Sequence, residues 1–189
     1  KLSANLTAYI IDFTNLAQTD FSDGNTNTNI KQLAGAYRSK GIEADVVARW
    51  ESLKIMAGYS FNETKFTKSN TFEVGSRLRF SPTHTANASA FYEFKKGFEL
   101  GLISNFVGVR YGGRPRPVNP ITDAEKLRIL IKSDAFTQVD LSLGYKYKAF
   151  TIRTKISNLG NALSYYVYDD NTISPIAPRM FTSTLSYIF

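Results

Sequence analysis

Few side chains in this sequence could carry out covalent chemistry. The chain has no cysteine and a single histidine, His84, so it offers neither a thiolate metal site nor a disulfide framework. His84 begins an apolar-facing stretch with no serine and aspartate arranged around it, which favours a packing role over catalysis. Glu43 and Asp45 stand two residues apart, where paired carboxylates could act as acid and base. The adjacent pair at 169–170 lacks the further ligands of a calcium site. We predict no catalytic residue, no metal site, no cofactor and no enzymatic activity.

Arginines and tyrosines could instead bind a ligand, because they gather in segments rich in glycine and proline. The turn "RYGGRPRP" holds three arginines and a tyrosine, and Arg77 and Arg79 precede a predicted strand. Guanidinium groups beside aromatic rings suit a planar, anionic metal chelate through bidentate hydrogen bonds and stacking. They suit lipopolysaccharide phosphates equally well, and keeping a loop soluble is a third role for each residue. The candidate ligand-binding residues are Arg110, Tyr111, Arg114, Arg116, Tyr165, Tyr166, Tyr168 and Arg179.

The composition limits the possible partners. The net charge of +7 and the pI near 9.5 would suit nucleic acid, lipid phosphate or an anionic ligand. The basic residues are scattered singly and form no known motif, so we predict no nucleic-acid partner. No apolar run approaches the ~20 residues of a membrane helix, which excludes a helical membrane protein. The sequence begins at Lys1 without a charged region followed by an apolar one, so we expect either a cleaved targeting signal or part of a longer chain.

An alternation of polar and apolar residues positions these side chains. In "KGIEADVVARW", Ile42 and Val46 share one strand face while Glu43 lies on the other. Such segments predict eight strands near residues 1–13, 37–50, 54–66, 83–95, 97–111, 135–148, 150–160 and 178–189. Many exceed the length usual in soluble sheets and match the roughly 9 to 11 residues of a tilted membrane strand.

The connections between the predicted strands alternate in length. Short turns at "ESL", "KKG" and "YKA" alternate with long polar loops near 14–36, 67–82, 112–134 and 161–177. Short turns on one rim and long loops on the other are typical of outer-membrane barrels. A soluble sheet would bury its apolar face in a core, but faces of alanine, glycine and single aromatics would fill a core poorly. We therefore predict an all-β fold, a membrane antiparallel β-barrel.

The barrel interpretation assigns the charged strand residues to a polar lumen. These lumen residues are Glu43, Asp45, Arg49, Arg153 and Lys155, and we expect Arg49, Arg153 or Lys155 to balance the two carboxylates. In one long loop, "ITDAEKLRILIKSD" could form a short amphipathic helix. Its apolar members would be Ile121, Leu127, Ile129, Leu130 and Ile131.

Four segments resemble those of TonB-dependent outer-membrane receptors. The stretch "NLGNALSYY", followed by a loop, "APR" and a last strand that closes on an aromatic, resembles the family's "NLFNKxYY" ending, with Gly160 in place of the usual phenylalanine. "RSKGIEADVVARWESLKIMAGYSF" is similar to the family's "SxGxE" strand pair. "RLRFSPTHTANASAFYEF" resembles "RLPxxPxHTxNLWxxY", and "GVRYGGR" resembles the strand and loop that follow. The segments occur in the family's order over nearly the whole chain.

The resemblance implies a wide barrel of about 22 strands, of which this chain would hold the last eight. Residues 1–189 would then be the C-terminal part of the transmembrane barrel domain, without the plug domain and the TonB box. The resemblance also implies a receptor in the outer membrane of a Gram-negative bacterium. Such a receptor would capture a scarce ligand at its extracellular loops and import it with energy from a TonB-type transducer. A ferric siderophore is the favoured substrate, while haem, cobalamin and glycans stay open.

The last strand, "FTSTLSYIF", suggests further partners. Leu185, Tyr187 and Phe189 would share the lipid face with Phe181 and Ser183. The pattern resembles the signal by which the barrel assembly machinery recognises its clients, while an interface aromatic is the simpler reading of Phe189. Membrane lipid and lipopolysaccharide are the other expected partners.

Two alternative functions stay open at this point. One is an autonomous eight-stranded outer-membrane barrel with a structural, adhesive or lipid-modifying role, which requires the first strand to pair with the last. The other is a soluble ligand-binding barrel, which the asymmetry of the loops disfavours.

Overall fold

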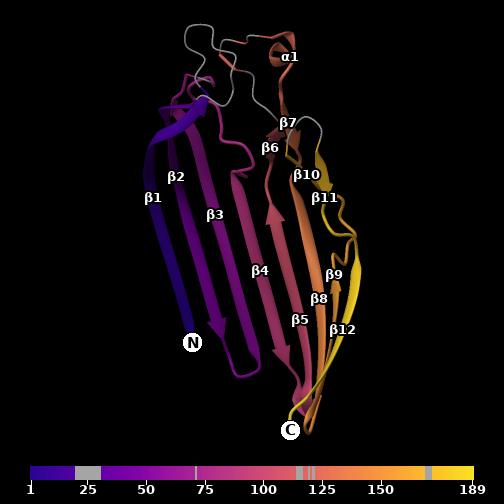
Figure 1. The fold of residues 1–189 in the computed structure, drawn as a ribbon. Helices are drawn as coiled ribbons and strands as arrows, with labels where there is room; N and C mark the ends of the chain where they lie inside the picture. The colour runs from indigo at the N-terminus through magenta and orange to yellow at the C-terminus, as the bar shows by residue number, and fades with distance from the viewer. Residues whose placement is uncertain (20–30, 71, 114–116, 119, 121, 169–171) are drawn as a thin grey trace.

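An eight-stranded antiparallel sheet forms most of the molecule (Figure 1). The computed structural model describes residues 1–19, 31–70, 72–113, 117–118, 120, 122–168 and 172–189. In spatial order the strands are β1 (Leu2–Thr19), β2 (Lys31–Arg49), β3 (Leu53–Lys68), β4 (His84–Glu93), β5 (Phe98–Val107), β8 (Phe136–Tyr147), β9 (Phe150–Ser157) and β12 (Met180–Tyr187). The wall strands therefore follow one another in an up-and-down order, as in simple antiparallel barrels.

Hairpins and short helical turns lie in the connections between these strands. β6 (Arg110–Gly113) pairs with β7 (Leu130–Ser133), and β10 (Tyr165–Val167) pairs with β11 (Ile173–Pro175). The 3-10 helix η2 (Lys95–Gly97) forms the turn between β4 and β5, and α1 (Asp123–Lys126) lies between β6 and β7. Within the described ranges, no helix has the length and apolarity needed to cross a membrane.

All eight predicted strands are present. The main correction is that β1 and β2 are longer than predicted. The predicted loop at 14–36 is strand over its described parts, because β1 and β2 both extend into it. The alternation of apolar residues breaks there because the register shifts between Phe13 and Leu16, with Asn15 at a positive φ of 59°. A bulge disrupts the ladder locally without ending it. The strand pair therefore continues where its periodicity is lost.

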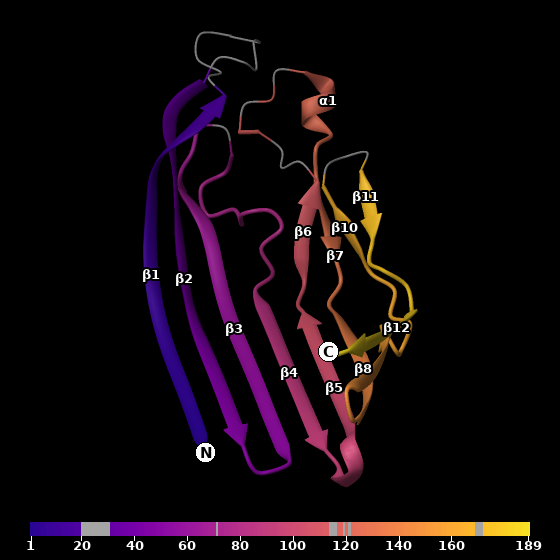
Figure 2. The same ribbon diagram turned by 60° about the horizontal axis from the view of Figure 1, so that its bottom comes forward.

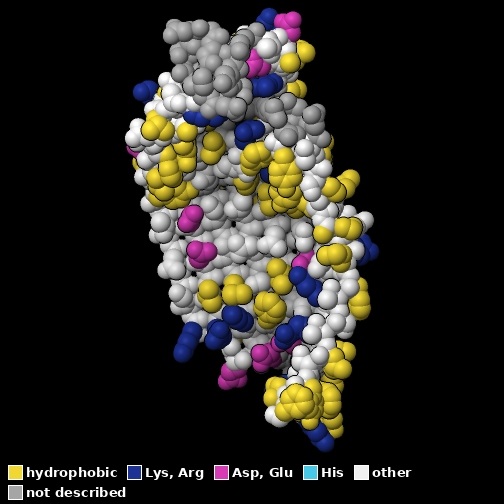
Figure 3. Space-filling model, viewed as in Figure 1, with side chains coloured by type: hydrophobic (Ala, Val, Ile, Leu, Met, Phe, Trp, Pro, Cys, Tyr) yellow, Lys and Arg dark blue, Asp and Glu magenta, His cyan; other side chains and the backbone are white. Residues whose placement is uncertain are grey.

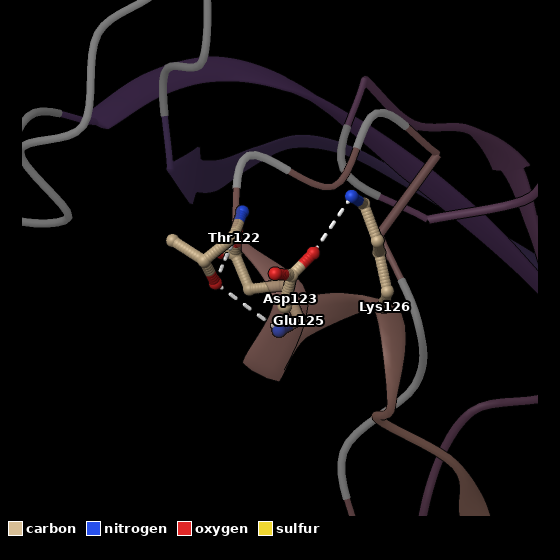
Figure 4. Close-up of polar contacts among 4 residues, drawn as sticks. All are labelled: Thr122, Asp123, Glu125 and Lys126. Carbon is tan, nitrogen blue, oxygen red and sulfur yellow. Dashed lines mark hydrogen bonds and ion pairs between the residues drawn. The ribbon is translucent and has the colours of Figure 1, made fainter.

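The predicted amphipathic helix at 121–134 is wrong in its length. Thr122 begins α1 with a capping box, in which the Glu125 N–H donates to Thr122 Oγ1 at 3.1 Å and the Thr122 N–H donates to Glu125 Oε2 at 3.0 Å (Figure 4). The helix ends at Lys126. Leu130 and Ile131 belong to β7 and pair with the glycines of β6. Pairing with a neighbouring strand thus overrides the helical spacing of the apolar residues.

The strand register separates the side chains into an apolar face and a polar face. Residues paired across neighbouring strands lie on the same face of a sheet. The apolar face carries Leu6, Ile10, Ile42, Val46, Tyr59, Leu100, Leu102, Leu143, Ile152 and Leu185. The polar face carries Asn5, Glu43, Asp45, Ser60, Asn87, Asn105, Gln138, Ser142, Arg153 and Thr184. The predicted alternation in and out of the wall is confirmed.

The large side chains of the apolar face are not covered by protein. Each of the apolar-face residues just named is at least 37% exposed. Among the described residues, only Ala48, Phe66 and Val167 are buried hydrophobic side chains. An apolar surface of this extent, opposite a polar one, is typical of a barrel wall in contact with lipid. The face drawn in Figure 3 has few hydrophobic side chains across its middle and charged side chains of both signs toward its lower end, as expected for the polar face.

The sheet is an open, curved trough. Figure 2 shows β12 brought round toward the viewer while β1 stays at the opposite edge. β1 and β12 are the two ends of the sheet order and do not pair with each other. This contradicts the autonomous eight-stranded barrel, which required that pairing. The diameter of a barrel grows with its strand number, so eight strands of a wide barrel complete only part of the circle.

Candidate functional site

The long connections gather at one rim of the wall. Figure 1 shows α1 and the hairpins β6–β7 and β10–β11 toward the upper ends of the strands, with both chain ends below. The lower rim carries the short turns between β2 and β3, β4 and β5, and β8 and β9. We call these ends the loop rim and the turn rim. The predicted alternation of long and short connections is confirmed, and the described candidate ligand-binding residues lie toward the loop rim.

Arg110, on β6, is the most enclosed of the described candidates. The residue is 4% exposed. Its Nη2 donates to the Tyr165 carbonyl at 2.7 Å and to Ser164 Oγ at 3.2 Å, and its Nη1 donates to the Asp134 carbonyl at 3.4 Å. These bonds meet the two Nη groups of the buried guanidinium, while its Nε is buried without a hydrogen-bond partner. Arg110 therefore joins β6 to the segment before β8 and to β10.

Two aromatic rings complete the surroundings of the Arg110 guanidinium. The central guanidinium carbon, Cζ, lies 4.9 Å from the ring centroid of Tyr166 and 5.2 Å from that of Phe136. Cation–π contact and stacking favour arginine at such a position. We call these residues, with Ser164 and Tyr165, the Arg110 cluster. The predicted pairing of arginine with tyrosine is present, but the cluster holds loops together and keeps the Arg110 charge away from solvent.

A close approach between hairpins brings β6 and β10 into contact beside this cluster. A Cβ atom placed on Gly112 would lie 1.9 Å from the Val167 carbonyl oxygen, so only glycine fits. Val167 is 2% exposed. The Phe80 N–H donates to the Tyr111 carbonyl at 2.8 Å, which adds the β3–β4 loop to the assembly. Three separate connections thus form one packed unit at the loop rim.

Tyr111 serves a different surface from its neighbour Arg110. It lines an outer groove of about 620 Å³ that also contains Tyr59, Arg77, His84, Phe106 and Lys132. Tyr59 and His84 belong to the apolar face, so the outer groove opens on that side of the wall at the loop rim. His84 Nδ1 lies 2.7 Å from Tyr59 Oη. This contact is in keeping with the packing role expected for the histidine.

Cations line the outer groove. Lys132 Nζ lies 2.9 Å from Asp134 Oδ1, and this hydrogen-bonded carboxylate raises the pKa of Lys132. Arg77 Nη1 donates to Thr83 Oγ1 at 2.5 Å. The groove therefore combines apolar walls with fixed positive charge.

The "NLGN" motif forms a second polar cluster at the loop rim, where the chain leaves β9. Asn158, where β9 has just ended, is 1% exposed and has a positive φ of 52°. Its Nδ2 donates to the carbonyls of Ala162 and Ala177, each at 3.0 Å, and its Oδ1 accepts from the Ala162 N–H at 2.8 Å. The Asn158 N–H donates to Asp140 Oδ1 at 2.9 Å. This Asn158 cluster fixes the direction in which the chain leaves the wall.

The remaining candidates are exposed or lie outside the described residues. Tyr165 and Tyr166 are each 40% exposed and Tyr168 is 50% exposed. Arg179 is exposed, and its N–H donates to Asn161 Oδ1 at 3.2 Å. Arg114, Arg116, Ile121, Asp169 and Asp170 lie outside the described residues. The surface that a ligand could reach here is thus mainly aromatic.

The charged residues predicted for the lumen lie on the polar face, but their partners differ from the expected ones. Arg153 Nη2 lies 3.2 Å from Glu99 Oε1, and Lys155 Nζ lies 2.7 Å from Asp140 Oδ2. Glu43, Asp45 and Arg49 are exposed on the distant strand β2. The expectation that Arg153 or Lys155 balances Glu43 and Asp45 is wrong, because several strands separate β9 from β2. In the described part of the chain, no group of three or more His, Cys, Asp or Glu side chains could hold a metal ion.

The last strand presents its large side chains outward. Leu185 and Tyr187 pair with Ile152 and Phe150 of the apolar face and are 70% and 48% exposed. Phe189 lies beyond the end of β12, with its ring centroid 5.0 Å from that of Tyr187. The predicted lipid-facing row is therefore present as far as Tyr187.

Sequence reasoning missed several residues that build this rim. Phe136 and Ser164 were not among the candidates because one opens a regular strand and the other is a common loop residue. Arg79 was noted, but not its partner: its Nη1 donates to the Gly113 carbonyl at 2.7 Å. Phe80, with a positive φ of 64°, follows it. The repeated arginine–aromatic spacing in "RLRF" and "VRY" was the available signal.

Comparison with known proteins places this wall in a family. A family described as "TonB dependent receptor-like, beta-barrel" matches residues 1–159. A TonB-dependent receptor of Haemophilus influenzae, described as uncharacterized, is 30% identical over 98% of this chain and 52% of its own length. The metal-pseudopaline receptor of Pseudomonas aeruginosa is 26% identical over 98% of this chain. The chain spans about a quarter of that relative's length and about half of the H. influenzae protein.

Solved structures show the same fold. The ferric-catecholate import receptor of E. coli superposes with a TM-score of 0.78 at 18% identity, over 100% of this chain and 25% of the receptor. The ferripyoverdine receptor of P. aeruginosa superposes with a TM-score of 0.78 at 17% identity, over 98% of this chain and 25% of the receptor. The fold of this chain thus matches about a quarter of each of these receptors. The chain belongs to the TonB-dependent receptor family and forms part of its β-barrel.

Proposed function

We propose that this chain is the C-terminal part of the barrel of an outer-membrane receptor that binds a scarce metal chelate, a ferric siderophore, and imports it. The observation that carries the proposal is the group of exposed tyrosines at the loop rim, Tyr165, Tyr166 and Tyr168, where the buried Arg110 contacts the Tyr166 ring and the Tyr165 carbonyl. Rings positioned by a rigid support can stack on a flat, conjugated chelate without a large loss of conformational freedom. Arg179 would add a positive charge to the same loop.

The names of relatives support a chelate as the substrate. The P. aeruginosa relative is named for metal-pseudopaline, and a Salmonella typhimurium relative that is 28% identical over 68% of this chain is named as the ferrioxamine B receptor. Both names describe metal chelates bound by those proteins. The aromatic and cationic side chains at the loop rim of this chain suit the same class of ligand.

The transport step would use residues outside this chain. We propose that the remaining strands close the wall beside β1 and β12, whose outer edges would otherwise leave backbone groups unpaired in the bilayer. A plug domain and a TonB box in the rest of the protein would connect the lumen to the energy transducer. The small and charged residues of the polar face, including Glu43, Asp45 and Arg153, would line the passage.

Three further partners complete the proposal. The outer groove, with Arg77 and Lys132 above apolar walls, suits lipopolysaccharide, whose phosphates would meet the cations and whose acyl chains would meet the wall. The exposed row that includes Leu185 and Tyr187 contacts membrane lipid. With Phe189 it would serve as the signal for the barrel assembly machinery.

The test of the proposed function is uptake of radioactive iron by the full-length receptor. The receptor is produced in a Gram-negative strain without its own siderophore receptors, and ferrioxamine B and a ferric catecholate are supplied separately. We expect uptake of at least one chelate that stops when the transducer gene is deleted. Replacing Tyr165, Tyr166 and Tyr168 by alanine should lower uptake about tenfold, as for the loss of aromatic hot spots at other binding sites.

A matched control separates binding from folding. Tyr92→Ala removes a tyrosine from the turn rim and should leave uptake unchanged. Heat-dependent migration in gels verifies that each variant is folded in the membrane. Uptake that persists without the transducer, or a folded receptor that imports neither chelate, would contradict the proposal.

A further inference from the structure

An apolar groove on the outer side of the wall lies at the turn rim. Its volume is about 760 Å³, and its lining includes Phe94, Lys95, Phe98, Leu100, Leu143 and Ile152. Phe98, Leu100, Leu143 and Ile152 occupy apolar-face positions in the strand register. The groove therefore opens toward lipid, on the side opposite the lumen. Because short turns mark the periplasmic rim of an outer-membrane barrel, it lies at the level of the inner leaflet.

The backbone of the β4–β5 turn is held against the neighbouring strand, which fixes one wall of this turn-rim groove. Gly97 has a positive φ of 85°, and a Cβ atom there would lie 2.2 Å from the Lys146 carbonyl oxygen of β8. Only glycine permits this approach. The rings of Phe98 and Tyr145 pack across the same contact, with their centroids 4.4 Å apart. The backbone on this side of the groove is therefore held in one position by the fold.

Positive charge borders the groove while the negative charge lies on the other face. Lys95 lines the groove, and Lys148 lies in the adjacent β8–β9 turn at the same rim, with its Nζ 5.4 Å from the ring centroid of the apolar-face residue Tyr147. No salt bridge within the described ranges involves either lysine. Glu99 reaches the groove from the polar face, but Arg153 binds it at 3.2 Å. The unpaired charge at the groove mouth is therefore cationic.

We propose that this turn-rim groove binds one anionic phospholipid of the inner leaflet. An acyl chain would lie along Phe98, Leu100 and Leu143, and the phosphate would face Lys95 and Lys148. Lysine side chains at a membrane interface keep their stems on apolar surface and extend their charge to the headgroups. The site lies on the opposite rim from the candidate chelate surface, so its occupancy does not depend on the proposed transport function.

The lipid would serve as a bound support for the β8–β9 edge of the wall. Phe150 and Ile152 are both about half exposed there, so the packing that surrounds them must come from the bilayer. A retained acyl chain is better ordered than bulk lipid and would pack against these side chains throughout the receptor's lifetime. Its headgroup would at the same time neutralise the cations of two adjacent turns.

The experiment uses the purified full-length receptor and native mass spectrometry. Dioleoylphosphatidylglycerol and dioleoylphosphatidylcholine, which differ in headgroup charge and share the same acyl chains, are titrated separately in detergent. We expect one phosphatidylglycerol to be retained at least about tenfold more tightly than phosphatidylcholine, since each lysine near a lipid surface adds roughly a fivefold preference. Equal retention of the two lipids would overturn the proposal.

Paired variants locate the site. Lys95→Gln with Lys148→Gln should remove most of the preference for phosphatidylglycerol. The control, Lys54→Gln with Lys146→Gln, removes the same charge at the same rim from polar-face positions and should leave the preference intact. Equal losses in both pairs would show a diffuse electrostatic effect and overturn the assignment to this groove.

A third variant tests the apolar part of the site. Ile152→Trp places a larger side chain in the groove and should weaken retention of both lipids about tenfold while the receptor stays folded in gels. If both lipids are retained as tightly as by the unchanged receptor, the acyl chain does not occupy the groove and the proposal fails.

Discussion

The two rims of the wall are stabilised by different kinds of contact. At the loop rim, enclosed polar side chains join segments that are distant in sequence: Asn158 is 1% exposed and Arg110 is 4% exposed. At the turn rim, aromatic rings on the apolar face pair across neighbouring strands, with centroids 4.4 Å apart for Phe98 and Tyr145 and 4.7 Å apart for Phe150 and Tyr187. One rim depends on specific hydrogen bonds, and the other on apolar surface placed at a membrane interface.

This difference sets how each rim should respond to substitution. A buried polar group that loses its hydrogen-bond partner keeps its desolvation cost, so a single substitution lowers the free energy of unfolding strongly. An exposed aromatic ring at a membrane interface can be replaced in part by lipid, and neighbouring rings remain. The long loops need buried side-chain hydrogen bonds because they have no continuous ladder of backbone hydrogen bonds to hold them in position.

The largest effect is expected for Asn158→Ala. The change removes both side-chain donors and the acceptor, and it places alanine at a φ of 52°. We expect a loss of roughly 3 kcal/mol in the free energy of unfolding, from several hydrogen bonds and a left-handed backbone. This loss is measured by unfolding the full-length receptor with urea in detergent while tryptophan fluorescence is recorded.

Asn161→Ala is the matched control for this prediction. Asn161 also has a positive φ, of 50°, but its side chain is exposed and accepts one hydrogen bond, from the Arg179 N–H. Its replacement should cost about 1 kcal/mol. Equal losses at the two asparagines would mean that backbone conformation, and not the buried hydrogen bonds of Asn158, dominates at the loop rim.

A smaller effect is expected for Arg110→Met. Methionine keeps much of the apolar contact with Phe136 and Tyr166 but leaves the Tyr165 carbonyl without its 2.7 Å hydrogen bond. We expect a loss of about 2 kcal/mol, and faster hydrogen exchange at the amides of β10, because β10 would detach from β6. Hydrogen-exchange mass spectrometry reports the second effect directly.

The exposed Arg179 provides the comparison. Arg179→Met removes the same charge from the exposed segment between β11 and β12 without breaking a buried hydrogen bond, so exchange in β10 should stay unchanged. If Arg110→Met left exchange in β10 unchanged as well, the Arg110 cluster would not be what holds the hairpins together.

The two rims also differ in how far the sequence predicts them. Alternation places the eight wall strands and their faces because every wall residue has only two directions in which to point. The short turns follow because each lies between two such patterns. Alternation fails at the bulge near Asn15 and in the β7 segment, where pairing with another strand decides the structure.

The loop rim carries no comparable pattern. The sequence pointed to Arg110 and Tyr111 as members of one set of candidate ligand-binding residues, but successive residues of β6 face opposite sides, one toward Tyr166 and the other toward the outer groove. Asn158 belonged to a segment identified by resemblance alone. Its role depends on the carbonyls of Ala162 and Ala177, whose positions follow from the folded loop and have no signature in residue type.

The smallest effect is expected for Phe150→Ala at the turn rim. Phe150 is 50% exposed and its ring lies 4.7 Å from that of Tyr187. Loss of such an aromatic pair costs about 1 kcal/mol, and lipid or detergent would refill part of the space. Thr151→Ala, on the polar face of the same strand, should change the free energy of unfolding by less. A loss at Phe150 as large as that at Asn158 would mean that the turn rim also depends on individual side chains. A loss near 1 kcal/mol would instead show that the exposed aromatic rings share their contribution, since Tyr187 keeps its T-shaped contact with Phe189 when Phe150 is removed.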